Sequence, residues 1–462
     1  MSEFETKKEV IDFVLKKSKE FDFNEFACDL LVSVTKQLRF YDNKISISKI
    51  WNSDKLQLFA STVDYRIYGT DILDVTPIKI EEALKELKSK LDISPPNPFY
   101  EGLAPYTQID YGNLNAFFDE KVEDLGDYAG DKVMGAINSA LEAGANKSAG
   151  LLQFDSNQYF VANSHGLNNS FKQSNYQFTI RSFVDGESTG QGVAAGRDIS
   201  SIENKLVKAG DQAGRLAKLS QNATMGKGGQ YDLVLSPTVA ANIFGGIIGA
   251  ANPISEIFGF SPFKDKVGEQ LAPDWMTVTN NSRHPEGPIS TPFDFEGHKT
   301  GQTNIIENGI FKRIVHSYST SKKFGGEPTG STFLFDIGGA KMVGPSTSNV
   351  FIDGGNNSLD ELLDKTSDRP TLYITSNWYT RFANYVETEF SSVPRDAILS
   401  VENGELTKPV KKIRISDNIL GMMKRIVGGT KETELIWWWE VEMPVSSPAI
   451  RVEDVRITTA GK

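Results

Sequence analysis

The sequence predicts an α+β protein of two domains, with a mixed helix/sheet N-terminal half and a β-rich, barrel- or sandwich-like C-terminal half. Two observations predict this architecture. Apolar residues at helical three- and four-residue spacing recur through the first 219 residues, between segments of β-rich composition. Beyond a flexible Gly-Lys-Gly-Gly joint at residues 226–229, strand patterns dominate. We therefore expect domains at residues 1–222 and 230–462.

The N-terminal half is expected to alternate helices and strands. Pro77 suits the first turn of a helix, and Ser200 with Glu203 has the spacing of a capping box. The turn residues 42–44 separate two β-rich stretches. The predicted helices lie near residues 10–15, 77–91, 131–141 and 198–219, and the predicted strands at 26–40, 45–68 and 176–180.

The C-terminal half carries two Glu-Asn-Gly segments between apolar runs, at residues 307–309 and 402–404. Asn-Gly favours the type I′ turn, so each segment predicts a β-hairpin. We also expect a helix from Ser236-Pro237 to about Ala251, a short helix capped by Ser416 or Asp417 and running through residue 426, and a final strand at 450–457.

Composition limits the chemistry. The chain of 462 residues has a net charge of −11, which disfavours a protein whose main work is binding nucleic acid. A single cysteine, Cys28, excludes an intrachain disulfide and a multi-thiolate zinc site, and it fits a cytoplasmic location. We expect neither a secretory signal nor a membrane span, because the N-terminus lacks an apolar segment and the uncharged run at 233–255 is broken by glycine and proline.

Three motifs favour structural interpretations. The glycines at positions 190, 192 and 196 are spaced one residue too widely for a dinucleotide-binding loop and indicate a glycine-rich strand end. Ser164 and His165 are neighbours in a sequence typical of a turn, where they are poorly placed as a nucleophile–base pair. Cys28 stands in an apolar context and is expected to be buried.

Asp294, Glu296 and His298 form the cluster of ionisable side chains best suited to chemistry. In an extended segment their alternation would place all three side chains on one face, where they could bind a metal ion or a basic substrate group near a substrate groove. Pro292 and Gly297 equally suit an exposed polar loop, and we favour that interpretation.

The predicted helix after Pro237 is informative for what it lacks. No charged residue and no histidine occurs between Asp232 and Glu256. A helix-borne zinc site of the peptidase type needs two histidines about one turn apart and a glutamate as base. This helix can therefore pack against a core but cannot hold zinc.

The order of motifs after Asn163 resembles that of the TldD/PmbA family. The segments that carry the resemblance are Asn163-Ser164-His165-Gly166, the stretch 190–197, the entry Tyr231 to Pro237, Pro292-Phe293-Asp294-Phe295-Glu296-Gly297, residues 306–311, Thr329-Gly330, Val401-Glu402-Asn403-Gly404-Glu405, Pro409-Val410 and the helix near 416–426. The N-terminal part matches only in general pattern.

The resemblance implies a division of labour. TldD-like members are similar to zinc peptidases, with an HExxxH motif on a helix and a downstream cysteine as a further ligand. This sequence has neither the motif after Pro237 nor a cysteine after Cys28. It therefore resembles the PmbA (TldE) branch, which implies no catalytic or metal-binding residues and no cofactor in this chain. A TldD-like partner would supply the zinc, and the pair would act on peptides or unfolded protein segments in an enclosed chamber. A homodimer is the alternative assembly when the chain is alone.

Trp437, Trp438 and Trp439 follow one another in a predicted strand. Successive side chains in a strand point to opposite faces, so the three cannot share one core. At least one is expected to point away from it, where it either anchors a subunit contact or is covered within the same chain.

Three functions remain open. The first is a non-catalytic subunit of a zinc-peptidase complex. The second is a metallopeptidase with an unusual site at Asp294, Glu296 and His298. The third is a protein that binds peptides without hydrolysis.

Overall fold

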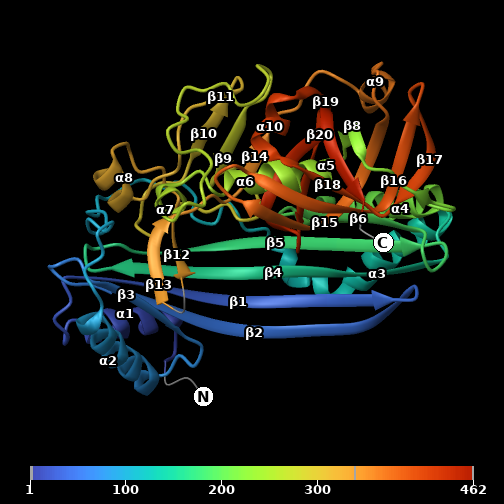
Figure 1. Ribbon diagram of the computed structural model, residues 1–462. Coiled ribbons are helices and arrows are strands. Elements are labelled where there is room, and N and C mark those ends of the chain that lie inside the picture. Colours follow the sequence, from blue (N-terminus) through green and yellow to red (C-terminus); the bar gives the residue numbers. More distant parts are fainter. Residues whose placement is uncertain (1–3, 338–339, 460–462) are drawn as a thin grey trace.

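The computed structural model describes residues 4–337 and 340–459, and it confirms the α+β class (Figure 1). The N-terminal half contains an antiparallel six-stranded sheet in the order β3-β2-β1-β4-β5-β6. Its elements are α1 (Lys7–Ser18), β1 (Glu25–Tyr41), β2 (Lys44–Ser61), β3 (Ile67–Ile72), α2 (Pro77–Ile93), α3 (Lys121–Glu142), β4 (Lys147–Asn163), β5 (Asn168–Phe183), β6 (Thr189–Gly196) and α4 (Ile202–Leu219).

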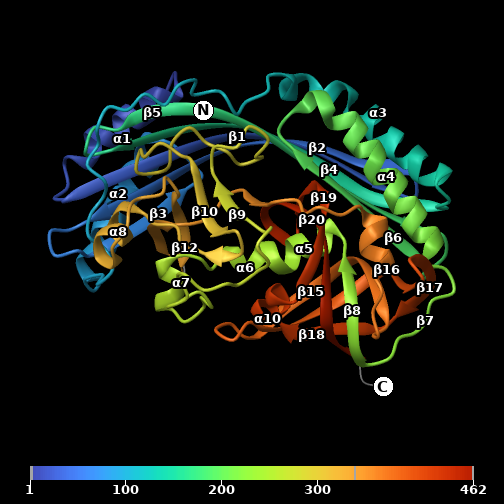
Figure 2. The ribbon, with the colours of Figure 1, turned by 90° about the horizontal axis from the view of Figure 1, so that it is seen from above.

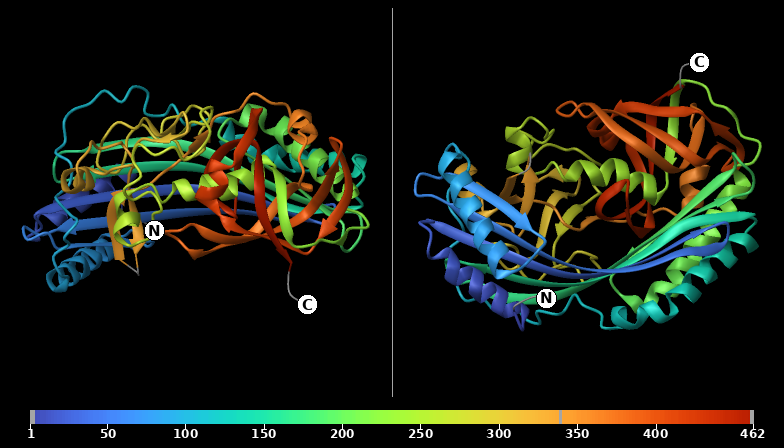
Figure 3. Two further views of the ribbon diagram at one scale, coloured as in Figure 1. Left: turned by 45° about the horizontal axis from the view of Figure 1, so that its top comes forward. Right: turned by 90° about the horizontal axis from the view of Figure 1, so that it is seen from below.

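Four helices cover one face of this sheet. Cys28 and Leu30 of β1 pack in a core with α1 and α2, whereas Leu38 and Phe40 of the same strand pack with α3 and α4. All four positions are even-numbered, so both helix pairs lie on one face, at opposite ends of the long strands. Figures 2 and 3 show the sheet curving around the C-terminal half, with α1, α3 and α4 on its outer side.

The inner face of the sheet packs against the C-terminal half at one end and is polar in its middle. Ala27 and Val161 share a buried cluster with Phe293 of the C-terminal half. Farther along, side-chain hydrogen bonds cross from β1 to β4, with donor–acceptor distances of 2.6 Å for Ser33–Asn157 and 3.0 Å for Gln37–Gln153.

The C-terminal half is built on a twelve-stranded mixed sheet with short helices, and β12 and β13 form a separate ribbon. The parallel pairs are β8 with β15, β14 with β20, and β7 with β17. Its strands are β7 (Thr224–Met225), β8 (Gly229–Leu235), β9 (Val278–Asn281), β10 (Gln302–Glu307), β11 (Ile310–Phe311), β12 (Thr332–Ile337), β13 (Ala340–Pro345), β14 (Val350–Ile352), β15 (Thr371–Asn384), β16 (Glu389–Glu402), β17 (Glu405–Lys411), β18 (Ile413–Asn418), β19 (Ile426–Trp438) and β20 (Val441–Thr459). Its helices are α5 (Pro237–Ala240), α6 (Gly246–Ile248), α7 (Pro253–Ile257), α8 (Tyr318–Phe324), α9 (Leu359–Asp364) and α10 (Ile419–Lys424).

The two sheets divide the chain between β6 and β7, beside the predicted joint. That residues 1–222 and 230–462 are separate folding domains stays a prediction. Within the described residues, no helix has both the length and the apolar character needed to cross a membrane.

The glycine-rich stretch is strand β6, as predicted, and its glycines permit close packing. A Cβ on Gly192 would lie 2.0 Å from the carbonyl oxygen of Ala209 in α4, and one on Gly190 would lie 2.2 Å from that of Ala213. The strand therefore contacts the helix backbone directly, which side chains larger than hydrogen would prevent.

Both predicted Asn-Gly hairpins are confirmed. Asn308 and Gly309 have φ of 50° and 75°, and Asn403 and Gly404 have φ of 52° and 81°. The left-handed conformation at both central residues is that of a type I′ turn.

Several predicted boundaries are wrong. Helix α3 begins ten residues before the predicted start, since Val122, Leu125 and Ala129 continue its buried stripe past two glycines. The predicted capping box does not form, because Asp198 accepts the hydrogen bond from the Ser200 N–H and Ser201 occupies the N-cap without a side-chain bond. The short helix near residue 420 is capped by Asn418, because β18 extends to that residue.

Candidate functional site

A cleft of about 590 Å³ opens beside the helical segment that follows Pro237. The Ser236 side chain caps this segment by accepting a hydrogen bond from the Val239 N–H. The segment is not the continuous α-helix predicted, because a π-helical turn (Ala241–Gly245) separates α5 from α6. π-turns are uncommon and are frequently found at functional sites.

The π-turn determines which residues face the cleft. Ala241 with Gly246, and Asn242 with Ile247, are two pairs spaced five residues apart, and all four residues line the cleft. A Cβ placed on Gly246 would have no atom within 4 Å, so this position is open space. The two histidines of an HExxxH motif are also five residues apart. Neither of the two pairs that face this cleft contains a histidine.

Asn242 is held by a polar network. Its amide nitrogen donates to the Glu440 carbonyl at 2.6 Å, and its amide oxygen accepts from Asn377 at 2.7 Å and from Thr380 at 2.6 Å. Ser392 joins Asn377 and Thr380 from the neighbouring strand, at 2.8 Å from each. The network ties the π-turn to β15, β16 and the β19–β20 turn.

The residues of the cleft do not fit a zinc ion. Protein zinc sites use three or four imidazole, thiolate or carboxylate ligands. The cleft offers only the carboxylates of Glu440 and Glu442, and Glu440 accepts a hydrogen bond from the Tyr379 N–H at 3.1 Å. None of the four histidines lines this cleft.

An aromatic rim borders the cleft. Tyr385 stacks on Phe382 at 4.9 Å between ring centroids and meets Phe260 edge-on at 5.2 Å. Trp439 also lines the cleft and is 63% exposed. Large exposed aromatic side chains grouped around one hollow are typical of an interaction site.

The network and the Tyr385 side of the rim were not predicted from the sequence, whereas Trp439 was a candidate contact residue. Asn242, Asn377 and Thr380 come from separate elements and are unremarkable individually. The one local signal was the aromatic content of residues 378–385.

Asp294, Glu296 and His298 do converge, but in a buried turn and not in a strand. Asp294 Oδ1 accepts hydrogen bonds from the backbone N–H groups of Glu296 at 3.1 Å and His298 at 2.9 Å. Gly297 has a φ of 88°, which closes the turn. Asp294 and Glu296 are both buried, so the favoured interpretation as an exposed polar loop was wrong.

Burial controls the electrostatics of this cluster. Glu296 Oε2 accepts from the Tyr318 N–H at 3.0 Å and from Thr332 Oγ1 at 2.8 Å. Burial, reinforced by the neighbouring Asp294, raises the pKa of Glu296 to about 8, and burial also raises the pKa of Asp294. The buried atoms Glu296 Oε1 and His298 Nδ1 have no hydrogen-bond partner within the described part of the chain.

One ligand atom from each of the three residues lies within 4.8 Å of the others. Carboxylate and imidazole groups suit a divalent cation, so the cluster has the donor set for one. Asp294, Glu296 and His298 line neither the cleft at the π-turn nor the two hollows along α4. Their proximity to a substrate groove stays a prediction.

Trp437 and Trp438 lie in strand β19 as predicted, whereas Trp439 lies in the turn that follows it, and the three do not share one core. Trp438 is buried, whereas Trp437 is half-buried and Trp439 is exposed. Trp439 stands edge-on to Trp438, with ring centroids 5.3 Å apart. The role of this run as a subunit contact stays a prediction.

The structural interpretations of Ser164, His165 and Cys28 are confirmed. Ser164 Oγ accepts from the Phe26 N–H, and His165 Nδ1 lies 2.9 Å from the Ala104 carbonyl oxygen, so the two side chains have separate partners. Cys28 is completely buried, and burial raises the pKa of its thiol.

Comparison with known proteins assigns the C-terminal half to a family. Residues 228–459 match the family described as the PmbA/TldA metallopeptidase C-terminal domain. The chain belongs to this family. The match covers β8, the π-turn segment and every strand after it.

Named relatives agree with this membership. A metalloprotease of Methanocaldococcus jannaschii is 31% identical over 45% of each chain. The metalloprotease PmbA of Escherichia coli O157:H7 is 27% identical over 57% of this chain and 56% of its own length. The matched region thus spans about half the length of these curated relatives.

The fold is shared over nearly the whole chain. The crystal structure of TldE from Thermococcus kodakarensis superposes with a TM-score of 0.82 at 19% identity, covering 97% of this chain and all of that one. The resemblance to the TldD/PmbA family is confirmed, and the PmbA (TldE) branch is consistent with these matches.

Proposed function

We propose that this chain is the non-zinc-binding subunit of a TldD/TldE-type metallopeptidase complex that acts on peptides or unfolded protein segments. A TldD-like partner supplies the zinc, and the two form a heterodimer in the cytoplasm. One observation carries the proposal. The π-turn forms one wall of the cleft, and the residues through which it faces the cleft are Ala241, Asn242, Gly246 and Ile247. None of these four carries the imidazole, thiolate or carboxylate group that a protein zinc site uses.

The structure of the cleft supports a binding role. The Asn242 network fixes the wall, and the aromatic rim provides apolar surface for the side chains of a bound segment. An aromatic rim is suited to contact a partner or a peptide, and it does not require a metal.

The test compares the chain alone with the chain mixed with a TldD-like partner. Zinc content and hydrolysis of a fluorogenic peptide library are measured for each sample. We expect metal and hydrolysis only when the partner is present. Stoichiometric zinc and hydrolysis by the lone chain would contradict the proposal.

The second candidate, a metallopeptidase centred on Asp294, Glu296 and His298, is favoured by the convergence of those three side chains. The variants Asp294→Asn and His298→Gln test it, with His284→Gln as the matched control. If the lone chain binds metal or hydrolyses peptide, and only the cluster variants lose it, the second candidate replaces the first.

The third candidate, binding without hydrolysis, rests on the same cleft. Peptide binding that persists with the partner present, without any cleavage, would favour it over the first. Sedimentation of the lone chain distinguishes a homodimer from a monomer.

A further inference from the structure

Strand β19 has a free edge that faces a groove. β19 pairs with β20 along one edge only. On its other side, the loop at residues 355–357 makes an isolated bridge between Asn357 and Thr430, at the point where the register of β19 with β20 shifts. Gly355 N donates to Thr430 O at 2.8 Å, and Lys431 N donates to Asn357 O at 2.9 Å. Two residues farther along the strand this pairing stops. Among the described residues, the backbone of 433–436 bonds only to β20.

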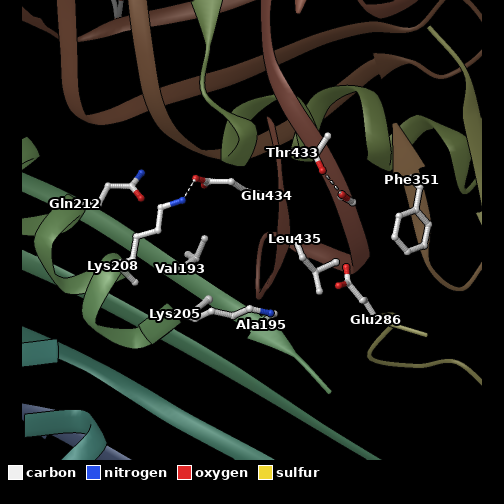
Figure 4. Close-up of a pocket in the computed structure, with 13 residues that line it drawn as sticks. Val193, Ala195, Lys205, Lys208, Gln212, Glu286, Phe351, Thr433, Glu434 and Leu435 are labelled. Atoms are coloured by element: carbon white, nitrogen blue, oxygen red, sulfur yellow. Dashed lines mark hydrogen bonds and ion pairs between the residues drawn. The ribbon is translucent and has the colours of Figure 1, made fainter. Parts of the chain in front are cut away.

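The groove lies between this edge and the N-terminal sheet. It has a volume of about 270 Å³, and Figure 4 shows β19 above it, α4 beside it and β6 below it. Three successive residues of each strand reach it, Thr433 to Leu435 from β19 and Val193 to Ala195 from β6. Because successive side chains alternate, contact with three in a row means that the strand edges themselves line the groove.

The groove continues along α4. A second hollow of about 370 Å³ shares Lys208, Gln212 and Glu434 with the first. Strand β6 is also the last strand of its sheet and pairs with β5 alone. The two hollows together run along α4 between two sheet edges, those of β19 and β6.

The charges in the groove are divided between its walls. Lys208 of α4 bridges to Glu434 of β19 at 2.8 Å (Figure 4). Lys205, one turn earlier on α4, lines the same groove and forms no ion pair with any described residue, although the carboxylate of Glu286 lines the groove too and Lys205 helps to lower the pKa of Asp198. An unpaired ammonium group at this position is complementary to a carboxylate on an incoming ligand.

We propose that the groove between β19 and α4 binds an extended peptide segment, which adds as a strand to the free edge of β19 and places an acidic side chain against Lys205. Peptide groups are the ligand that satisfies a row of alternating strand-edge donors and acceptors. The chain's own Asn357 already makes one such bridge, to Thr430 at the start of this edge. The inference deepens the proposed function by adding a second peptide site. It rests on that function only in taking peptides as ligands. The groove itself is separate from the cleft at the π-turn.

The experiment uses the full chain alone, without metal or partner. The probe is a fluorescein-labelled heptapeptide of alternating Thr and Val with a central Glu, and its affinity is measured by fluorescence polarisation. Matched probes carry Gln or Lys at the centre. We expect the Gln probe to bind several-fold more weakly than the Glu probe, and the Lys probe at least tenfold more weakly.

Two further series test the geometry. N-methylation of successive probe residues removes one N–H at a time, and strand addition predicts large losses at every second position only. Lys205→Gln should abolish the preference for the Glu probe over the Gln probe, whereas Lys85→Gln, an exposed lysine of α2, should leave it unchanged.

The proposal is overturned if the affinity losses in the N-methylated series do not fall at every second position. It is also overturned if the Lys205→Gln protein still binds the Glu probe more tightly than the Gln probe. Absence of probe binding, combined with weaker partner association in Lys205→Gln, would also overturn it and make the groove a subunit contact. Zinc content and partner-dependent hydrolysis do not enter these measurements, so either proposal can fail without the other.

Discussion

Arg451 of β20 and Asp232 of β8 form an ion pair, with 3.3 Å between Nη2 and Oδ2, and both side chains are completely buried. Arg369 donates to the other carboxylate oxygen of Asp232 at 2.8 Å, and Arg451 also donates to the Leu362 carbonyl at 2.7 Å. Burial acts to raise the pKa of Asp232, but hydrogen bonds from Ser367 and Arg369 outweigh it and hold that pKa below its ordinary value. The cluster fixes β8, which leads directly into the π-turn segment.

Asp232→Asn should therefore be strongly destabilising. It leaves Arg451 as a buried charge without its partner, which costs about 3–5 kcal/mol. Urea unfolding followed by circular dichroism measures the change. Asp92→Asn, which removes an exposed partner of Lys88, is the control and should change stability by less than about 1 kcal/mol. Equal effects of the two variants would contradict the assignment.

Glu296 should make stability depend on pH. Its folded pKa of about 8 lies above the ordinary value of 4.5, so between these values the unfolded chain loses this proton while the folded protein keeps it. The contribution is complete below about pH 4.5 and declines as pH rises toward 8, by up to about 1.4 kcal/mol per pH unit.

Glu296→Gln mimics the protonated acid and should remove this decline. The test is the unfolding free energy of both proteins at several values between pH 5 and pH 8. The exposed Glu327→Gln serves as the control and should retain the wild-type slope. Parallel curves for the wild type and Glu296→Gln would show that Glu296 does not hold its proton.

Replacing Gly192 and Gly246 by alanine should change the stability of the protein in opposite directions. A Cβ at position 192 would meet the backbone of α4 at 2.0 Å, so we expect Gly192→Ala to destabilise the protein by about 1–3 kcal/mol. At position 246 no atom lies within 4 Å, and alanine favours helix by up to about 1 kcal/mol. Thermal unfolding compares the two, and a stable Gly192→Ala protein would refute the close β6–α4 contact.

The sequence predicted local features well where one stretch of chain contained the whole signal. The type I′ hairpins at Asn308 and Asn403, and the Ser236 cap, depend on a few neighbouring residues. The start of α3 was missed because glycines at 126 and 130 interrupt a stripe that tertiary packing nevertheless completes.

The site was harder to predict, because its parts are brought together only by folding. Asp294 and Glu296 were assigned to an exposed loop since Pro292 and Gly297 suit a surface turn, and their burial comes from Tyr318 and Thr332 farther along the chain. The absence of ligand residues after Pro237 was visible in the sequence. The π-turn was not, because nothing in its composition distinguishes it from an α-helix.

Neighbouring tryptophans of the run should differ in what their loss affects. Trp438 is buried in the core, so Trp438→Ala should cost about 3–5 kcal/mol of stability. Trp439 is 63% exposed and lines the cleft at the π-turn, so Trp439→Ala should leave the thermal midpoint unchanged. If Trp439 anchors the proposed TldD-like partner, its loss should weaken association at least tenfold, as expected when an aromatic anchor is removed. Biolayer interferometry with the purified partner measures this, and Tyr41→Ala, another exposed aromatic residue on the distant β1, is the matched control. Unchanged association with weaker peptide binding would instead assign Trp439 to the substrate side of the cleft.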